Sequence, residues 1–267
     1  MKIVEYGMKT IGKIILGAVC AVAAYGTAAA ETKFADETLN YVSTDKWGLI
    51  TKDSGDATLT LKNQGSKYYI KLTGKTKPWA DGLFQVRDTL ISVMDKAKFR
   101  PLSYTKIAHE GGKYGKDVIE YAYSGDQVSG KATKHREKKG ETKTENLELS
   151  ATGDTFDMLS VFYWLRSIDP ATLPIGKKVT ATLFSGSHEE TVKIWKVGED
   201  TVKLRDGSKR EAWHIRFTFT SKGGKKTSDD IDAWISKDSK RIPLEIKGKL
   251  PLGHVNAYLV NGGGLGE

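Results

Sequence analysis

The sequence has almost no cysteine. Cys20 is the only cysteine among 267 residues, and it lies in an N-terminal segment that we expect to be removed. The rest of the chain can then form no disulfide, no zinc site with thiolate ligands and no cysteine nucleophile. A chain of this length still buries a sizeable hydrophobic core without crosslinks.

The first thirty residues are typical of an export signal. Three lysines precede an apolar run over residues 14–24, and alanines at positions 28–30 supply the small residues of a cleavage site. We therefore predict that residues 1–30 are a signal peptide cleaved near Ala30. The mature protein is then expected to be periplasmic or secreted.

A membrane anchor and a lipoprotein are the two alternatives for this segment. The run over residues 14–24 is shorter than the roughly 20 apolar residues that cross a bilayer as a helix. A lipidated cysteine has a small residue just before it and a large aliphatic residue three positions back, whereas Gly17, Ala18 and Val19 precede Cys20. We expect neither alternative, and we expect that the mature chain does not span a membrane.

The chain is basic, with 42 Lys and Arg against 33 Asp and Glu. Without the predicted signal peptide the balance is 39 to 32, a net charge of +7. An exported basic protein meets membrane surfaces and acidic glycans first, so we expect no nucleic-acid partner. The simplest interpretation is that lysine-rich strand faces keep the protein in solution.

From residue 36 onward, apolar residues recur mostly at every second position. Leu59 and Leu61, for example, alternate with threonine and lysine, as expected for a strand with one buried face. Clusters rich in Gly, Asn, Asp and Ser separate these segments, and such residues reach the positive φ angles of hairpin turns. The clusters are at residues 63–66, 110–112, 124–126, 139–140, 205–208 and 221–224.

Strands joined by such turns pair with their neighbours as an antiparallel meander. About a dozen strands are expected, which is too many for one flat open sheet. We therefore predict a mainly β fold, a curled antiparallel sheet or barrel-like β-clam. We expect a single β-rich domain over residues 31–261 and a flexible, glycine-rich tail over residues 262–267.

One segment, at about residues 155–168, breaks the two-residue period and is predicted to be a helix. Asp154 or Thr155 can cap its first amides, while Asp157 and Arg166 suit the charges of its two ends. Its apolar residues cover nearly all sides of a helix. This predicts that the sheet wraps around a buried helix.

Two further segments depart from the alternating pattern. Residues 129–146 carry six basic and three acidic residues but almost no large apolar side chain. We predict a long exposed hairpin there that turns near Lys139 and Gly140. A shorter interruption at residues 78–84 predicts one helical turn.

Several short segments spread over nearly the whole mature chain form a recognisable set. They are Glu37, Leu39 and Tyr41; residues 83–88, Asp95 and residues 99–101; Asp157, Leu159, Ser160, Tyr163 and Arg166; and residues 233–238 and 241–244. This set resembles an uncharacterised family of exported bacterial proteins, the domain of unknown function 3108. The resemblance implies an exported, barrel-like β fold and lends no activity, because the family has none assigned.

No constellation of catalytic or metal-binding residues is visible. The five histidines lie too far apart in sequence to form a local ligand pair. Ser187 and His188 are adjacent, and adjacent residues on a strand point to opposite faces. The acidic cluster at residues 229–232 lacks the glycine turn of a calcium loop. We expect no enzymatic activity, no metal and no cofactor.

A charged residue beside an apolar segment must form an ion pair, lie exposed to water or bind a ligand. The candidate site residues are Arg87, Asp88, Asp157, Tyr163, Trp164 and Arg166. One interpretation is structural, in which an ion pair locks the helix to the sheet. The other is a ligand site, in which Arg166 or Arg87 holds an anionic head and the apolar part of the ligand lies against Tyr163 and Trp164.

The sequence leaves two functions open. The first is a binding module that holds a hydrophobic or lipid-like envelope molecule inside the curled sheet. The second is a non-catalytic structural or interaction protein, whose basic hairpin docks on a partner or on an anionic envelope surface. A cavity lined by the helix would support binding, whereas a packed core around the helix would support interaction.

Overall fold

The computed structural model describes residues 34–47, 50–186, 188–221, 227–250 and 253–262. The predicted signal peptide, its cleavage site and residues 263–267 of the predicted tail lie outside these residues. Gly262, the first residue of that predicted tail, is the last residue of a strand.

The chain consists almost entirely of strands. The strands are β1 (Glu37–Trp47), β2 (Ile50–Gln64), β3 (Lys67–Thr76), β4 (Val86–Asp95), β5 (Pro101–Glu110), β6 (Lys113–Ser124), β7 (Gln127–Lys138), β8 (Glu141–Thr152), β9 (Thr155–Phe156), β10 (Val179–Phe184), β11 (Glu189–Lys203), β12 (Lys209–Ser221), β13 (Ile231–Ser236), β14 (Pro243–Leu250) and β15 (Gly253–Gly262). The short helices are α2 (Pro78–Asp81), α3 (Ser160–Arg166) and the 3-10 turn η1 (Pro170–Thr172).

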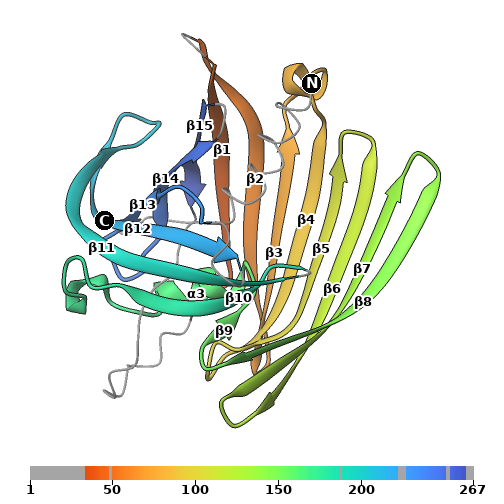
Figure 1. Ribbon diagram of the computed structural model, residues 1–267. Coiled ribbons are helices and arrows are strands. Elements are labelled where there is room, and N and C mark those ends of the chain that lie inside the picture. Colours follow the sequence, from red (N-terminus) through yellow and green to blue (C-terminus); the bar gives the residue numbers. More distant parts are fainter. Residues whose placement is uncertain (1–33, 48–49, 187, 222–226, 251–252, 263–267) are drawn as a thin grey trace.

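All these strands belong to one 15-stranded sheet, in the order β8-β7-β6-β5-β4-β3-β2-β1-β15-β14-β13-β12-β11-β10-β9. The first and last strands of the chain pair with each other in the middle, so that β1–β8 form one wing and β9–β15 the other. Figure 1 shows the two wings curling toward each other into a nearly closed, barrel-like shape. The predicted fold class is confirmed, with 15 strands where about a dozen were expected.

The hairpin turns fall where the sequence predicted them. The loop between β7 and β8 is Lys139 and Gly140, with φ angles of 52° and 82°, as a type I′ turn requires. The predicted turn at residues 221–224 lies mostly outside the described residues. The helical turn predicted at residues 78–84 is α2, which starts with Pro78 at its first position.

The predicted buried helix is present but shorter than expected. Thr155 and Phe156 form β9 instead, because they pair in parallel with Thr182 and Leu183 of β10. The helical pattern of the sequence extends over these two residues. Their backbone groups nevertheless pair with a strand almost thirty residues later in the chain instead of with a helical turn. Tertiary pairing therefore outweighs the local signal at the start of the segment.

Asp157 starts α3, in place of the caps expected at Asp154 or Thr155. Its Oδ1 accepts hydrogen bonds from the amides of Leu159 at 2.7 Å and of Ser160 at 2.9 Å. These amides belong to the first turn, where a helix has no carbonyl partners of its own. The helix begins at Ser160 as a consequence.

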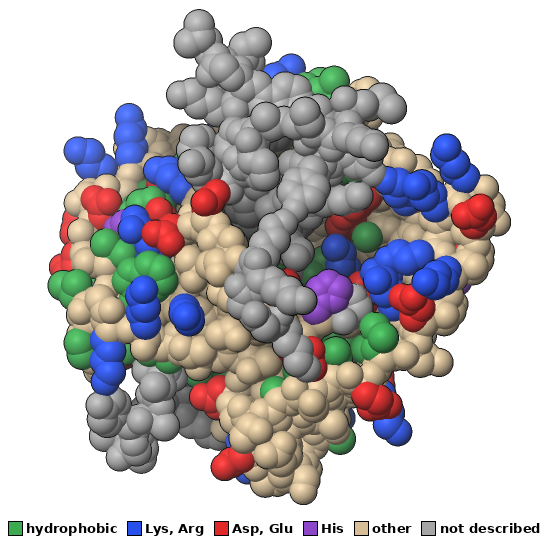
Figure 2. All heavy atoms as spheres, in the orientation of Figure 1, with side chains coloured by type: hydrophobic (Ala, Val, Ile, Leu, Met, Phe, Trp, Pro, Cys, Tyr) green, Lys and Arg blue, Asp and Glu red, His purple; other side chains and the backbone are tan. Residues whose placement is uncertain are grey.

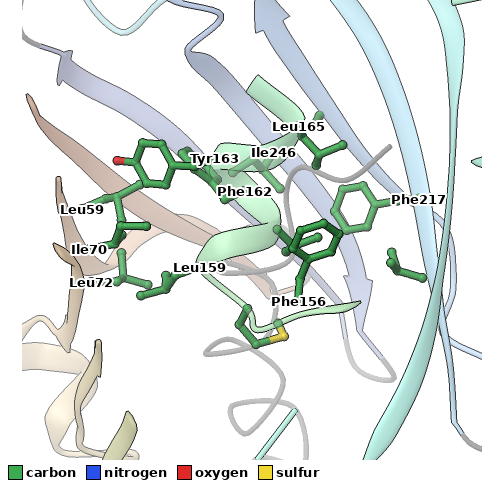
Figure 3. Close-up of a cluster of buried hydrophobic side chains, with 14 of the residues drawn as sticks. Leu59, Ile70, Leu72, Phe156, Leu159, Phe162, Tyr163, Leu165, Phe217 and Ile246 are labelled. Atoms are coloured by element: carbon green, nitrogen blue, oxygen red, sulfur yellow. The ribbon is translucent and has the colours of Figure 1, made fainter. Parts of the chain in front are cut away.

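The helix α3 is part of the hydrophobic core. Leu159, Phe162, Tyr163 and Leu165 are each at most 7% exposed, and burying each such side chain contributes roughly 1.5–3 kcal/mol. In Figure 3, Leu59, Ile70 and Leu72 of β2 and β3 lie on one side of the helix, and Phe217 of β12 lies on the other. The prediction that the sheet wraps around this helix is confirmed.

Candidate functional site

The inner face of the wing β4–β8 changes from apolar to charged along its strands. At one end the inner side chains are Leu90, Tyr104, Ile119, Ala132 and Leu149, all buried. At the other end they are Asp88, Lys106, Glu110, Asp117 and Arg136. In Figure 2, Lys and Arg side chains gather over the part of the molecule that β6–β8 occupy in Figure 1.

A pocket of about 220 Å³ lies at the charged end. We call it the concave pocket. It is lined by Lys106, Ala108, Glu110, Lys113, Tyr114, Gly115, Asp117 and Arg136. These residues come from three neighbouring strands, β5, β6 and β7, whose register places Lys106 opposite Asp117 and Gly115 opposite Arg136.

An ion pair between Arg136 and Asp117 forms one wall of the concave pocket. Arg136 Nη1 lies 2.5 Å from Asp117 Oδ1, and Nη2 donates to Oδ2 at 2.8 Å. The guanidinium reaches Asp117 by lying across Gly115, where an added Cβ would come within 3.3 Å of Arg136 Cδ. A glycine at this position therefore leaves the space that the pair needs.

Lys106 supplies a positive charge that is only loosely paired. Its Nζ lies 3.9 Å from Glu110 Oε1, beyond hydrogen-bond distance, and its side chain is 29% exposed. Within the described part of the chain the ammonium makes no hydrogen bond. Lys106 is consequently placed to donate to an anionic group that enters the concave pocket.

Asp88 lies behind the concave pocket and is 6% exposed. Its Oδ1 accepts from the amide of His109 at 3.2 Å. Burial is the main reason why the pKa of Asp88 is raised to about 7. The negative charge of Glu110 and an interaction with its side chain raise this pKa further, whereas the positive charge of Lys106 lowers it. The raised pKa of Asp88 favours the protonated, neutral form of this buried carboxyl near neutral pH.

The apolar end of the inner face is filled by the tip of the β10–β11 hairpin. The ring of Phe184 stacks on Tyr121 with centroids 5.5 Å apart and an interplanar angle of 14°. It also packs over Gly130, where an added Cβ would lie 2.9 Å from the Phe184 ring. Gly186 lies against Asp117 in the same way, and an added Cβ there would lie 2.7 Å from Asp117 Oδ2. Side-chain packing thus brings the two wings together at this seam.

Two buried hydroxyl groups near this seam have no hydrogen-bond partner among the described residues. They are the hydroxyl of Tyr121 and the Oγ of Ser185. Buried polar atoms are nearly always hydrogen-bonded to protein, to water or to a ligand. One water molecule is enough to satisfy each of these atoms.

In a comparison with protein families, residues 41–260 match the family described as "Protein of unknown function (DUF3108)". The chain belongs to the DUF3108 family. The resemblance inferred from the sequence is thereby confirmed. The DUF3108 description carries no activity, and a search of curated proteins finds no match.

Two solved structures are similar to this DUF3108 chain. One is a beta-barrel-like protein of domain of unknown function DUF1849 from Brucella abortus, with a TM-score of 0.57, 12% identity, and coverage of 86% of this chain and 98% of that one. At this identity the likeness shows the fold alone. The other is the hypothetical lipoprotein YmcC from Escherichia coli, with a TM-score of 0.31, 8% identity, and coverage of 89% and 92%.

Arg166 and Tyr163, two of the candidate residues, meet at Glu37 of β1 in this DUF3108 protein. The two terminal guanidinium nitrogens of Arg166, Nη1 and Nη2, contact the Glu37 carboxylate, and the Tyr163 hydroxyl donates to Oε1 at 2.8 Å. Arg166 also donates to the carbonyls of Lys240 at 2.8 Å and Arg241 at 3.1 Å. Protein groups thus occupy the donors of Arg166, and the pair joins the helix to the sheet.

The other candidate residues lie apart from this pair. Asp157, at the opposite end of α3, accepts from Ser92 Oγ at 2.7 Å, and burial raises its pKa to about 6 against the effect of that hydrogen bond. Trp164 packs on Phe156 with ring centroids 4.4 Å apart.

Arg87 and Asp88, although adjacent, point to opposite faces of β4. Arg87 lies on the outer face, where its Nη2 pairs with Asp81 of α2 at 2.6 Å. Asp88 points inward to the concave pocket. Of the six candidate residues, only Asp88 therefore adjoins this pocket.

Sequence reasoning missed Lys106, Glu110, Asp117 and Arg136. Their signal is present in the sequence, since Lys106 and Glu110 share the strand face of Tyr104, which is a core position. Charged residues at core positions of neighbouring strands indicate either a polar cavity or a set of buried ion pairs. The expectation of surface charge obscured this signal.

Two observations bound the chemistry of the described residues. They contain no group of three His, Asp or Glu side chains placed to hold a metal ion. None of the helices within residues 34–262, as far as these are described, is long and apolar enough to cross a membrane.

Proposed function

We propose that this DUF3108 protein is a non-catalytic binding module for an amphiphilic envelope molecule, and that the anionic group of this molecule lies in the concave pocket. The loosely paired ammonium of Lys106 carries the proposal. A phosphate or carboxylate in the pocket would accept a charge-assisted hydrogen bond from it, and such bonds are roughly twice as strong as neutral ones.

The apolar part of the ligand has a surface next to the pocket. Leu147 and Ala151 of β8 are only partly buried, and they lie on the inner face of the same group of strands. A chain leaving the pocket along these strands would remove their apolar surface from water. The unpartnered hydroxyls of Tyr121 and Ser185 would meet the polar part of the same molecule.

The surroundings of α3 favour the concave pocket over the ligand site that the sequence suggested against Tyr163 and Trp164. The apolar residues of the helix belong to the hydrophobic core, and Arg166 is held by Glu37 and by backbone carbonyls. A ligand against Tyr163 and Trp164 would have to break these contacts. The envelope location itself rests on the predicted signal peptide.

The test is native mass spectrometry of the protein purified from exporting cells, followed by lipid extraction. We expect a co-purifying anionic amphiphile on the wild type. Lys106→Met should lose it, and titration with dihexanoyl phosphatidic acid should then show affinity lowered about tenfold, which equals about 1.4 kcal/mol. Lys116→Met, an exposed lysine on the outer face of β6, is the matched control. A wild type with the mass of the bare polypeptide and no affinity for the probe would count against the proposal.

A further inference from the structure

The strand β8 is an edge of the sheet (Figure 1). Its only neighbour in the sheet is β7, and the hairpin pairs Lys138 with Glu141 next to the turn. In an antiparallel pair joined by a two-residue turn, the backbone N–H and C=O groups of every second residue bond to the neighbouring strand. The backbone groups of the residues between them point away from that strand. The backbone groups that point away are those of Thr142, Thr144, Asn146 and Glu148.

One end of this edge is already covered. The amide of Ser150, next in the outward-pointing series, donates to Glu189 Oε1 of β11 at 3.3 Å. Residues 141–148 have no such cover from the described part of the chain. This leaves an open edge without a proline, and without a bulge in its register with β7.

Free edges of this kind accept a further strand unless a protein blocks them. Proline, bulges, covering loops and charged side chains are the usual blocks, and β8 lacks the first two along its whole length. Its ionic residues on the inner face are Lys143 and Glu145, which pair with each other at 2.5 Å. This edge is therefore complementary to a partner strand that places a negative residue opposite Lys143 and a positive residue opposite Glu145.

We propose that this partner is β8 of a second copy of the chain, paired antiparallel about a two-fold axis at Thr144. In this register the outward-pointing backbone groups of Thr142, Thr144 and Asn146 meet Asn146, Thr144 and Thr142 of the second copy. Lys143 lies opposite Glu145 of the second copy, and Glu145 opposite its Lys143. Opposite charges placed across two strands stabilise the pairing.

The neighbouring registers are less favourable. An axis at Lys143 places this lysine opposite itself, and an axis at Glu145 does the same for the glutamate. Like charges directly opposite each other destabilise a strand pair. In the register at Thr144, pairing extends from residue 141 to residue 147 of each copy, and it stops before Ser150, where Glu189 already covers the edge.

The pairing makes one continuous sheet from two molecules. A two-fold axis perpendicular to the sheet keeps both inner faces on the same side, so the two concave pockets would open on one shared surface. A strand pair of this length buries less area than a standard interface. The dimer is therefore expected to dissociate on the order of micromolar concentration.

Sedimentation equilibrium across the micromolar range tests the dimer. Glu145→Lys places two lysines opposite each other and should raise the dissociation constant about tenfold. The double variant Lys143→Glu with Glu145→Lys restores opposite charges and should return the constant to near the wild-type value. Glu120→Lys, the same charge change at an exposed position of β6, should leave it unchanged.

Thr144→Pro tests the backbone pairing separately. The amide of Thr144 points away from β7, so that the change removes no backbone hydrogen bond of the hairpin, only the exposed contact of the Thr144 hydroxyl with His135. Proline is tolerated on such edges. We expect a monomer with nearly unchanged thermal stability. A wild type that stays monomeric, or a dimer that responds to neither Glu145→Lys nor Thr144→Pro, would overturn the proposal. A dimer that Glu145→Lys weakens and the double variant does not restore would overturn the register.

Discussion

Arg166 of α3 and Glu37 of β1 form a buried ion pair between residues 129 positions apart in sequence. Arg166 Nη2 donates to Glu37 Oε2 at 3.0 Å, and the side chain of Arg166 is 1% exposed. The rings of Phe34, Phe162 and Tyr163 lie around its guanidinium, with centroids at 5.0, 5.5 and 5.1 Å. The pair fixes the interior helix to the first strand of the sheet.

Removing the carboxylate from this pair should destabilise the fold strongly. Glu37→Gln leaves a buried guanidinium without a counterion, and we expect the free energy of unfolding in urea to fall by about 3–5 kcal/mol. Lys62→Met, which breaks the exposed pair with Asp36, should leave the free energy of unfolding almost unchanged, because water screens such pairs. Combining Glu37→Gln with Arg166→Met should cost less than the sum of the two single changes. Additive costs would contradict a direct coupling.

Asp157 should tolerate loss of its charge but not loss of its acceptor. Asp157→Asn keeps an oxygen for the amides of Leu159 and Ser160 and gives Ser92 a donor, so we expect a change below about 1 kcal/mol. Asp157→Ala removes the cap and leaves Ser92 unpaired, which should cost about 2–4 kcal/mol. Thermal unfolding of the two variants distinguishes them. Equal losses would mean that the negative charge is what α3 requires.

Gly130 should be intolerant of a larger residue. A Cβ there would lie 2.9 Å from the Phe184 ring and 3.1 Å from Ile119 Cγ2, and overpacking of this kind costs about 1–3 kcal/mol. Gly130→Ala should therefore lower the midpoint of urea unfolding, and Phe184→Leu should relieve part of the clash in the double variant. Gly74→Ala is the control, because nothing lies within 4 Å of a Cβ on this strand residue. Equal effects of both alanines would show that strand propensity, not packing at the seam, decides the loss.

Asp88 should make the stability depend on pH in the acid to neutral range. Its pKa rises on folding from the ordinary value of 3.8 to about 7, so the folded protein binds the proton more tightly than the unfolded chain. The stabilisation from this group is complete below about pH 4 and is lost as the pH rises through about 7.

Asp88→Asn removes this proton equilibrium. We expect the variant to match the wild type near pH 4 and to exceed it by roughly 1–3 kcal/mol at pH 8, measured by urea unfolding at several pH values. Asp126→Asn, at an exposed turn, should follow the wild type throughout. A constant difference between Asp88→Asn and the wild type at all pH values would show that Asp88 does not titrate on folding.

Features that depend on residues close together in the chain could be predicted from local sequence patterns. Alternation along segments such as residues 58–62 predicted strands with one buried face, because side chains of a strand point to opposite sides in turn. Lys139 and Gly140 predicted a hairpin, because a tight turn needs positive φ angles at both positions. The apolar stretch at residues 155–168 predicted an interior helix, because no single face of it could meet water.

The tertiary structure alone decided which distant residues meet. Glu37 became the partner of Arg166, and Thr155 and Phe156 became a strand, through contacts with segments that no local pattern specifies. The concave pocket arises in the same way, since Lys106, Asp117 and Arg136 come together only when three strands take up one register. Periodicity fixes the face on which a side chain lies, but register and curvature fix its neighbours across the sheet.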